Sequence, residues 1–336
     1  MEKISVIIPS YNSYKTIRSC VLSVISTKYP ALEIIIIDDA STDDSPHVLK
    51  QLALEYPQIV RFVRLGSNSG PANARNTGAR YATGKYLFFL DSDTEMLNDA
   101  LDNFIKRIEK ADAVTGIYYY EPINRGPAQE YKALLNYYFF SRKGVIKYEV
   151  FDSSRAGISA EVFKEIGGFR EDLVWEMDYE NEEFGYRLSK KYINLLDPSV
   201  MVRHIFPDMA KLTKNYFRRV SLWMEIFLNR RRFESGGVTS VETGICTAAL
   251  LFAITTLPLI VVNIGFCSIP LIFFLIYLYG YSGFFIYVFK QKRRFFPLAI
   301  LLQIYFSIII GLGAISGMIK VLTRRSDVRL KLSGGI

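Results

Sequence analysis

The sequence contains little cysteine and little histidine, with three Cys and two His in 336 residues. Cys20, Cys246 and Cys267 lack the spacing of a metal site or of a disulfide framework. Two of them lie inside apolar runs. The pattern therefore argues against a cysteine-based metal centre and a disulfide-stapled fold, and it fits a reducing compartment.

Several other signals are also missing. No signal peptide precedes the first predicted strand, which begins almost at once, so we expect the N-terminal region to stay in the cytosol. No glycine- and lysine-rich triphosphate loop stands near the N-terminus, which argues against a nucleotidyltransferase. No nucleic-acid recognition motif accompanies the net charge of +8, so no nucleic-acid partner is expected.

Charge is absent from two long stretches near the C-terminus. Residues 243–289 contain no charged side chain, and neither do residues 295–319. Because a helical span needs about 20 apolar residues, the first stretch has room for two spans, divided near Asn263, and the second for one. We therefore expect a transmembrane region of two to three helices over residues 243–320, followed by a basic tail over 321–336.

Basic residues flank these apolar stretches. They are Arg230, Arg231 and Arg232, the basic residues from Lys290 to Arg294, and Lys320, Arg324 and Arg325. Positive charge beside a span is typical of the cytoplasmic side and attracts anionic lipid. The predicted location is the cell membrane, with several passes and a cytosolic N-terminal domain. A full third span puts the basic tail outside, whereas a bend near Gly311 keeps it inside.

A basic amphipathic stretch leads into the apolar runs. Residues 211–232 interleave Lys214 and Arg218 with Phe217 and Trp223. This composition predicts a helix in the plane of the lipid headgroups, and an ordinary amphipathic core helix is the alternative. We accordingly divide the chain into a cytosolic domain over 1–208, interfacial helices and a linker over 209–242, and the membrane part.

Strand and helix signals alternate through the first 120 or so residues. Short runs of β-branched or aromatic residues at 5–8, 33–37, 60–63 and 86–90 predict buried strands. Helical patterns at residues 14–27, 45–55 and 70–82 lie between them. This alternation predicts an α/β fold, with a mostly parallel sheet and helices on both faces.

Acidic residues follow two of the predicted strands. Asp91 and Asp93 come directly after the apolar run 86–90, and Asp39 follows the run 33–37. Strand ends of an α/β sheet form the usual ligand crevice. Two hard oxygen ligands one residue apart suit a divalent ion and a phosphate-bearing partner.

Four motifs in register resemble glycosyltransferase family 2, which has the Rossmann-like GT-A fold. The motifs are Ser5-Val6-Ile7-Ile8-Pro9-Ser10-Tyr11-Asn12, Ile37-Asp38-Asp39-Ala40-Ser41-Thr42-Asp43, Gly70-Pro71-Ala72-Asn73-Ala74-Arg75-Asn76-Thr77-Gly78 and Leu90-Asp91-Ser92-Asp93. Residues 158–170, with Gly167-Gly168-Phe169, resemble the acceptor-side segment of the family. The resemblance covers about residues 4–208.

The resemblance implies a nucleotide-sugar site at the strand ends. Its binding residues would be Pro9, Tyr11, Asp39, Arg75 and Asp91, with Tyr11 stacking on the base and Asp39 accepting a hydrogen bond from it. The guanidinium of Arg75 would reach the diphosphate or a site acid.

The resemblance also implies a metal site. Asp93, together with Asp91, would hold Mg²⁺ or Mn²⁺, which neutralises the departing nucleotide diphosphate. His204 follows the acidic helix and would be a third metal ligand or a phosphate contact. A structural histidine is the alternative.

The expected catalytic base departs from the family pattern. Alignment on the segment Gly185-Tyr186-Arg187-Leu188 places Glu180 and Asn181 where the family has Glu-Asp. Because an amide cannot accept a proton as a base, Glu180 or Asp178 is expected to take that role. Some retaining relatives of this fold carry Glu-Asn here, so retention stays open beside the inversion that the family implies.

We therefore predict a membrane-anchored, metal-dependent glycosyltransferase of cell-envelope polysaccharide synthesis. It would move a sugar from a nucleotide-sugar, a UDP-sugar by the resemblance, to a lipid-linked or membrane-associated acceptor. A polyprenyl-phosphate acceptor is the first alternative, since a phosphate oxygen needs no strong base. An inactive membrane scaffold is the second. A processive synthase is disfavoured because the chain lacks a Gln-x-x-Arg-Trp motif.

Overall fold

The computed structural model describes residues 1–172, 180–230 and 240–323. The chain divides into two compact units. The first comprises residues 1–124 and 140–205, and the second comprises residues 125–139 and 206–336. A short segment from the N-terminal half of the sequence thus belongs to the C-terminal unit. The domain boundaries expected from the sequence stay a prediction.

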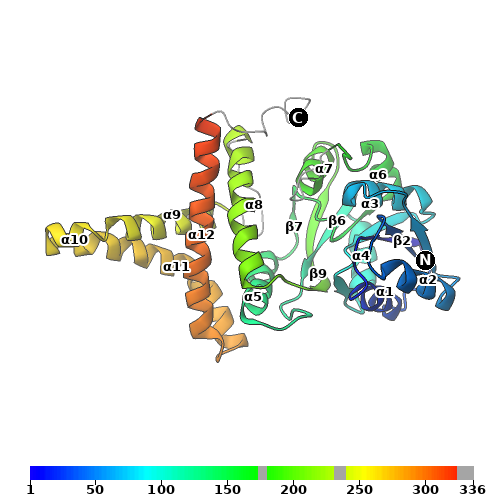
Figure 1. The fold of residues 1–336 in the computed structure, drawn as a ribbon, viewed down its shortest axis with the longest axis horizontal. Helices are drawn as coiled ribbons and strands as arrows, with labels where there is room; N and C mark the ends of the chain where they lie inside the picture. Colours follow the sequence, from blue (N-terminus) through cyan, green and yellow to red (C-terminus); the bar gives the residue numbers. More distant parts are fainter. Residues whose placement is uncertain (173–179, 231–239, 324–336) are drawn as a thin grey trace. The chain divides into compact units, whose positions relative to one another are not determined.

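The first unit is built on a mixed β-sheet (Figure 1). Among the described residues the strand order is β3-β2-β1-β4-β8-β6-β9-β5, with β7 paired to β9. The strands are β1 Ile4–Ser10, β2 Leu32–Asp38, β3 Val60–Arg64, β4 Tyr86–Leu90, β5 Thr94–Met96, β6 Ala113–Tyr118, β7 Ile146–Lys147, β8 Arg155–Ser159 and β9 Asn194–His204. The predicted α/β architecture is therefore present.

Strand direction changes across the sheet. Strands β3, β2, β1 and β4 run parallel to one another. Beyond β4 the antiparallel pairs β4–β8, β6–β8 and β5–β9 enter, so the sheet is mixed, where the sequence suggested a mostly parallel one. Between β6 and β8 the chain passes through α5, most of which belongs to the second unit and so does not serve as the crossover helix that parallel neighbours need.

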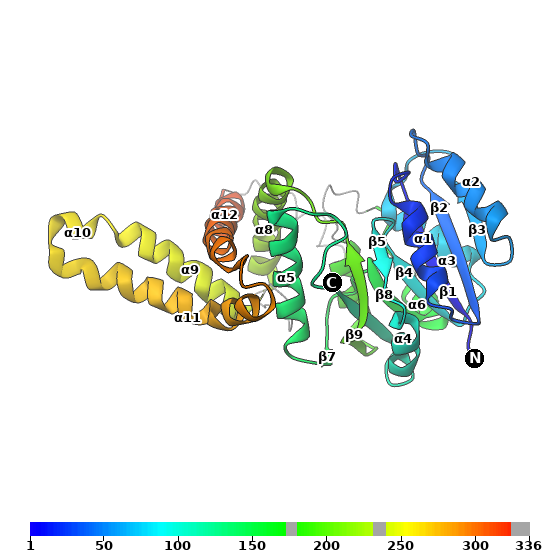
Figure 2. The ribbon, with the colours of Figure 1, turned by 90° about the horizontal axis from the view of Figure 1, so that it is seen from below.

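Helices cover both faces of this sheet (Figures 1 and 2). They are α1 Ile17–Ser26, α2 Ser45–Glu55, α3 Gly70–Tyr81, α4 Ala100–Ile108, α6 Ala160–Ile166 and α7 Glu180–Leu188. Side chains alternate along each strand. Val6 and Ile8 of β1 enter the core with α1, α2 and α4, whereas Ile7 enters the core with α3, α6 and α7. The two-sided burial explains why these strands are apolar throughout.

A glycine sets how closely α3 approaches the sheet. A Cβ atom at Gly78 would clash with the side chain of Ile7 in β1. The close contact holds α3 against β1 and β2, so its first turn lies beside the carboxyl ends of those strands.

The second unit consists of helices. These are α5 Pro127–Ser141, α8 Met209–Arg230, α9 Val241–Thr256, α10 Leu259–Val262, a 3-10 turn η1 Ile264–Cys267, α11 Ser268–Gln291 and α12 Phe296–Leu322. Only the first thirteen residues of α5 lie in this unit. Helix α11 packs against α9, and α12 packs against α8, as both ribbon views show (Figures 1 and 2).

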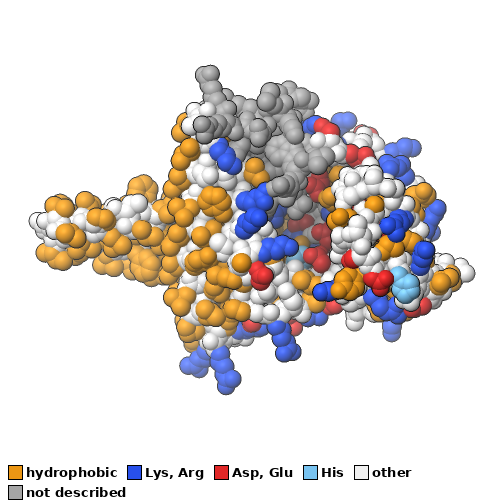
Figure 3. Space-filling model, viewed as in Figure 1, with side chains coloured by type: hydrophobic (Ala, Val, Ile, Leu, Met, Phe, Trp, Pro, Cys, Tyr) orange, Lys and Arg blue, Asp and Glu red, His pale blue; other side chains and the backbone are white. Residues whose placement is uncertain are grey.

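Within the described part of the chain, three helical segments are long and apolar enough to cross a membrane. They are Val241–Val262, Ile264–Gln291 and Phe296–Leu322. The first two divide at Asn263, as the sequence predicted. Hydrophobic side chains cover the surface of this region (Figure 3). The predicted basic tail, apart from Val321, Leu322 and Thr323, lies outside the described residues.

Helix α8 approaches α12 closely. A Cβ atom at Gly313 would clash with the backbone oxygen of Phe217, and one at Gly317 with that of Ser221. Small residues that let two backbones come together are typical of helix pairs in membranes. The headgroup-plane orientation expected for residues 211–232 stays a prediction.

A buried polar chain ties α5 into this unit. The hydroxyl of Tyr131 donates to Oε1 of Gln303 at 2.7 Å, and Nε2 of Gln303 donates to the Ser307 hydroxyl at 3.1 Å. The ring of Tyr131 also stacks on Phe306 with centroids 5.2 Å apart. Because polar groups among apolar helices need partners, these contacts fix α5 against α12.

Candidate active site at the carboxyl edge of the sheet

The ends of β1, β2 and β4 meet at one edge of the sheet. Pro9 pairs with Ile37, and Ser10 pairs with Asp38, so β1 and β2 end side by side. Tyr11 follows directly and keeps 48% of its surface exposed. An exposed ring beside two strand ends is suited to stacking on a planar ligand.

Asp39 anchors the loop that leads into α3. Its Oδ1 accepts a hydrogen bond from the backbone N–H of Ser69, and its Oδ2 accepts one from Gly70, both at 2.8 Å. The side chain is 4% exposed. Each carboxylate oxygen keeps further acceptor capacity, so the contact with a base expected from the sequence is compatible with this anchoring.

Two residues next to this carboxylate have left-handed backbone. Asn12 has φ +51° and Ala40 has φ +57°. Asparagine adopts this backbone conformation readily, whereas for alanine it costs about 1 kcal/mol or more. Strain of this kind persists only where the surrounding structure holds it, and here it turns the chain sharply after β2.

Asn12 is a residue of this edge to which the sequence analysis gave no role. Its Oδ1 accepts hydrogen bonds from the backbone N–H groups of Thr42 and Asp43 at 2.9 and 3.3 Å. Its own N–H donates to the hydroxyl of Ser41. These bonds join the loop after β1 to the loop after β2. The signal was an asparagine directly after a strand, where it suits a turn.

Arg75 joins two of the predicted site acids. Its Nη2 donates to Oδ1 of Asp91 at 2.8 Å, and its Nη1 donates to Oε1 of Glu180 at 2.9 Å. Arg75 and Glu180 are 4% and 5% exposed. A buried guanidinium shared by two carboxylates is well compensated, and it fixes the end of β4 relative to the start of α7.

Asp93 faces the predicted histidine. Oδ2 of Asp93 lies 3.5 Å from Nε2 of His204. The β5–β9 register produces this pairing, because Thr94 lies opposite His204. The structure thus brings together two residues that lie 111 positions apart in the sequence (204 − 93), and both carry atoms that bind divalent metals.

Asn181 has a structural contact at the start of α7. Its Oδ1 accepts hydrogen bonds from the backbone N–H of Ser153 at 3.1 Å and from the Ser153 hydroxyl at 2.6 Å. The amide therefore holds the loop before β8 against α7. Asp178, the other acid considered as a base, lies outside the described residues.

The predicted acceptor-side segment is clamped from two sides. Asn76 on α3 accepts from the N–H of Phe169 and donates to its carbonyl oxygen. Arg187 on α7 donates to the carbonyl oxygens of Ile166 and Gly168, each at 2.7 Å, and pairs with Glu183. Helices α3 and α7 therefore fix the segment together.

A second buried arginine lies beside His204. The guanidinium of Arg155 lies 3.8 Å from the ring centroid of Tyr118 and pairs with Asp152 at 2.6 Å. The Tyr118 ring in turn contacts the His204 ring, with centroids 4.6 Å apart. Burial raises the pKa of the Tyr118 hydroxyl, so Tyr118 stays neutral at physiological pH. The sequence analysis missed this group, whose only signal was a polar Asp-Ser-Ser-Arg run after Val150 and Phe151.

The donor set at Asp93 and His204 fits a divalent ion in part. One carboxylate and one imidazole supply two ligands, which leaves coordination positions for diphosphate oxygens and water. Among the described residues no group of three His, Cys, Asp or Glu side chains is placed to hold a metal. Asp91 uses Oδ1 in the contact with Arg75, and its expected part in the metal site stays a prediction.

Comparison with known proteins decides the family. Residues 5–167, just under half of the chain, match the family model described as glycosyl transferase family 2. The chain therefore carries a family 2 glycosyltransferase domain. The match contains Tyr11, Asp39, Arg75, Asp91 and Asp93, and it ends before α7.

Curated relatives of this glycosyltransferase domain are similar over short stretches. Uncharacterized glycosyltransferase YibD of Escherichia coli is 48% identical over 95 residues, which are 28% of this chain and 27% of YibD. The GalNAc(5)-diNAcBac-PP-undecaprenol beta-1,3-glucosyltransferase of Campylobacter jejuni is 32% identical over 113 residues, 34% of this chain and 37% of the relative. The chain thus spans less than half the length of these relatives.

One solved structure is similar over nearly the whole chain. The mannosyltransferase PcManGT of Pyrobaculum calidifontis, in complex with GDP-Man and Mn²⁺, has a TM-score of 0.58 and 19% identity. The likeness covers 97% of this chain and 88% of PcManGT. At this identity the likeness shows the fold, and it confirms the predicted GT-A-like architecture of the glycosyltransferase.

Proposed function

We propose that the chain transfers a sugar from a nucleotide-sugar to a lipid-linked acceptor at the membrane. The observation that carries this proposal is the cluster of acids at the carboxyl edge of the sheet. There Asp39 follows β2, and Asp91 and Asp93 follow β4, the two strands that flank β1 inside a family 2 domain. The Campylobacter relative, whose name includes an undecaprenol-linked acceptor, supports a lipid-linked substrate.

On this proposal the donor lies along the ends of β1, β2 and β4. Tyr11 stacks on the base, and Pro9 and the neighbouring backbone border it. Asp39 accepts a hydrogen bond from the base while it holds the Ser69 and Gly70 amides. Asp91 lies on the sugar side, where Arg75 keeps its carboxylate in place.

The metal belongs with Asp93 and His204. These two side chains would hold Mg²⁺ or Mn²⁺, which neutralises charge on the departing diphosphate. Tyr118 packs against the imidazole ring and fixes its orientation. The PcManGT structure, which holds Mn²⁺ with a nucleotide-sugar, supports metal dependence.

The residues expected at the position of the catalytic base bear on which class of acceptor the enzyme uses. With a sugar hydroxyl as acceptor, Glu180 or Asp178 takes the proton, since Asn181 cannot. Glu180 already holds Arg75 through one oxygen, and Asn181 is committed to Ser153. This arrangement favours the second candidate, transfer to a polyprenyl phosphate, because a phosphate oxygen attacks without losing a proton.

Membrane placement follows from the second unit. Three apolar helices would hold the enzyme where a hydrophobic acceptor is presented. The basic residues at the α11–α12 turn favour a cytoplasmic location for that turn and for the catalytic unit.

The decisive experiment measures donor and acceptor together. The full chain, purified in detergent with Mn²⁺, is given a panel of UDP- and GDP-sugars and a bacterial lipid extract, and the lipids are analysed by mass spectrometry. We expect one lipid to gain one hexose-type mass with a UDP-sugar, and Asp93→Asn to abolish the product. A product with GDP-sugars alone contradicts the UDP assignment. No product and no nucleotide-sugar hydrolysis with any donor supports the inactive scaffold.

A further inference from the structure

A cavity lies at the turn between α11 and α12. It has a volume of about 530 Å³ and is lined by Glu130, Lys292, Arg293, Arg294 and Phe295. All five residues belong to the second unit. Three cations and one carboxylate give the lining a net charge of +2.

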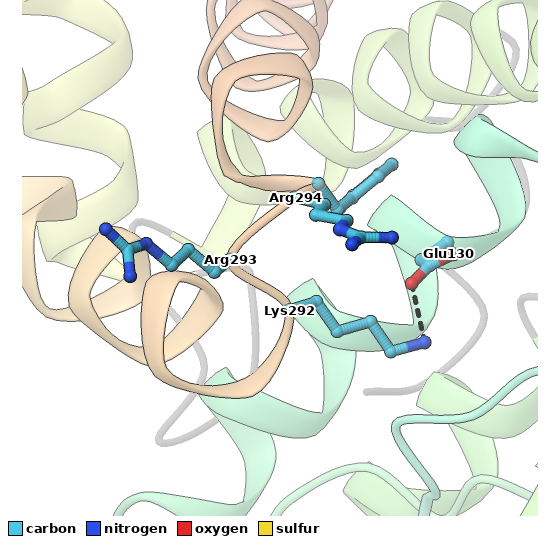
Figure 4. A pocket seen from close by; sticks show the side chains of 5 residues that line it. Glu130, Lys292, Arg293 and Arg294 are labelled. Carbon is cyan, nitrogen blue, oxygen red and sulfur yellow. Dashed lines mark ion pairs between the residues drawn. The ribbon is translucent and has the colours of Figure 1, made fainter.

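The cations of this cavity are arranged unequally (Figure 4). Lys292 pairs with Glu130 on α5 at 2.5 Å, and these side chains are only 30% and 28% exposed. Arg294 extends toward the same side as this pair. Arg293 extends to the other side of the turn, where its guanidinium lies 5.3 Å from the ring centroid of Phe289. Glu130 thus offsets the charge of Lys292, and Arg294 is left facing the cavity.

The start of α12 adds to the positive potential. The helix begins at Phe296 and runs for 27 residues, so the positive end of its dipole lies beside Arg294. A guanidinium next to a helix N-terminus matches the geometry and charge of a phosphate group. Phe295 supplies an apolar wall to the same cavity.

The location of this turn in the chain points to a lipid headgroup as the source of the phosphate. The turn joins the end of one apolar segment, Ile264–Gln291, to the start of another, Phe296–Leu322. If both segments cross the bilayer, their junction lies at the level of the lipid headgroups. Basic side chains gather at this end of the helices (Figure 3).

We propose that this cavity binds the phosphate of an anionic membrane lipid, held chiefly by Arg294 and Lys292 with the start of α12. Glu130 pairs with Lys292 and thereby limits the net charge of the cavity. The acyl chains would then run along the exposed apolar surfaces of α11 and α12, where Ile286 and Leu298 are exposed.

The test compares matched arginines on the same turn. The full-length protein in detergent is titrated with dioleoyl phosphatidylglycerol, and native mass spectrometry gives the dissociation constant of the first bound lipid. Arg294→Gln should raise this dissociation constant about tenfold, the scale of one charge-assisted hydrogen bond. Arg293→Gln removes the same charge but should change it by no more than about twofold, as expected for an exposed charge.

Two further arms separate a site from general attraction and a lipid from free anion. Glu130→Gln should tighten binding, because it raises the net charge without touching Arg294. Dioleoyl phosphatidylcholine should bind more weakly, and millimolar inorganic phosphate should not compete. Equal losses of lipid affinity in Arg293→Gln and Arg294→Gln, or full competition by inorganic phosphate, would overturn the proposal. Should Arg294→Gln fail to fold, an unchanged constant in Glu130→Gln would overturn it as well. No arm uses a sugar donor, so the outcome is independent of the proposed activity.

Discussion

The two aspartates of the 91–93 motif lie one residue apart and have different surroundings. Asp91 bonds to the buried Arg75, which also holds Glu180, and its side chain is 32% exposed. Asp93 faces the imidazole of His204, and its side chain is 44% exposed. Asp91 is therefore part of a charge-compensated framework, whereas Asp93 lies next to a metal-binding atom at a solvent-accessible edge. The two acids of this one motif thus differ both in their partners and in their exposure.

The largest contrast is expected in catalysis. Asp93→Ala should lower sugar transfer about 10³-fold, the loss of several kcal/mol of charge stabilisation by a metal. Its melting temperature should stay near that of the parent, because the side chain is exposed. Asp91→Asn is the matched variant and should lower the melting temperature, since Arg75 loses one of two carboxylates. Transfer assays and thermal melts in detergent measure both, and equal melting shifts for the two variants would remove the distinction.

Arg75 provides the second test of the contrast between Asp91 and Asp93. Arg75→Met leaves Glu180 buried without its guanidinium and should cost about 3–5 kcal/mol of stability. Adding Glu180→Gln should return part of that loss, because the buried charge disappears. Denaturant unfolding of the single and double variants gives the coupling energy. Additive losses would mean that the two side chains do not stabilise each other.

Glu180 and Asn181 test the acceptor class. Glu180→Gln keeps an oxygen for Arg75 but cannot take a proton, so kcat should fall about 10²-fold with a hydroxyl acceptor. Asn181→Ala should lower kcat less, chiefly by releasing the Ser153 loop. With a phosphate acceptor both losses should be small. A dead Asn181→Ala beside an active Glu180→Gln would show that the amide is the functional group, contrary to our assignment.

His204 tests the Asp93 side of the comparison, and its substitution should have the smallest effect. His204→Asn keeps a polar side chain but removes the imidazole, and the apparent affinity for Mn²⁺ should fall about tenfold, or about 1.4 kcal/mol. Saturating Mn²⁺ should restore most of the rate. A variant with unchanged Mn²⁺ dependence would make His204 a structural residue packed on Tyr118.

The sequence predicted the first half of the fold closely because local patterns determine it. The strand predicted at residues 86–90 and the helix predicted at 45–55 coincide with β4 and α2. Motif spacing also placed Asp39, Asp91 and Asp93 at strand ends. The antiparallel strands β5 and β8 were not foreseen, since their sequences, Thr-Glu-Met and Arg-Ala-Gly-Ile-Ser, lack the continuous apolar run that marks β4.

Contacts between distant residues were the harder part of the site. No local pattern shows that Arg75 bonds to Glu180, because α7 reaches α3 only through tertiary packing. The same holds for Arg155, whose position under Tyr118 depends on the pairing of β8 with β6. The role of Asn181 was likewise visible only once its partner Ser153 was placed.

Helix α5 has a consequence for how the protein is made. It leaves the ribosome well before α12, yet Tyr131 packs on Gln303 and Phe306 of that later helix. Until α12 is synthesised, this side of α5 lacks its partner, and an exposed surface of this kind invites misassembly during translation. The packing of α5 is therefore completed only after the last described helix has been made. A shortened protein that ends at residue 205 should aggregate, unless residues 125–139 are replaced by a polar loop.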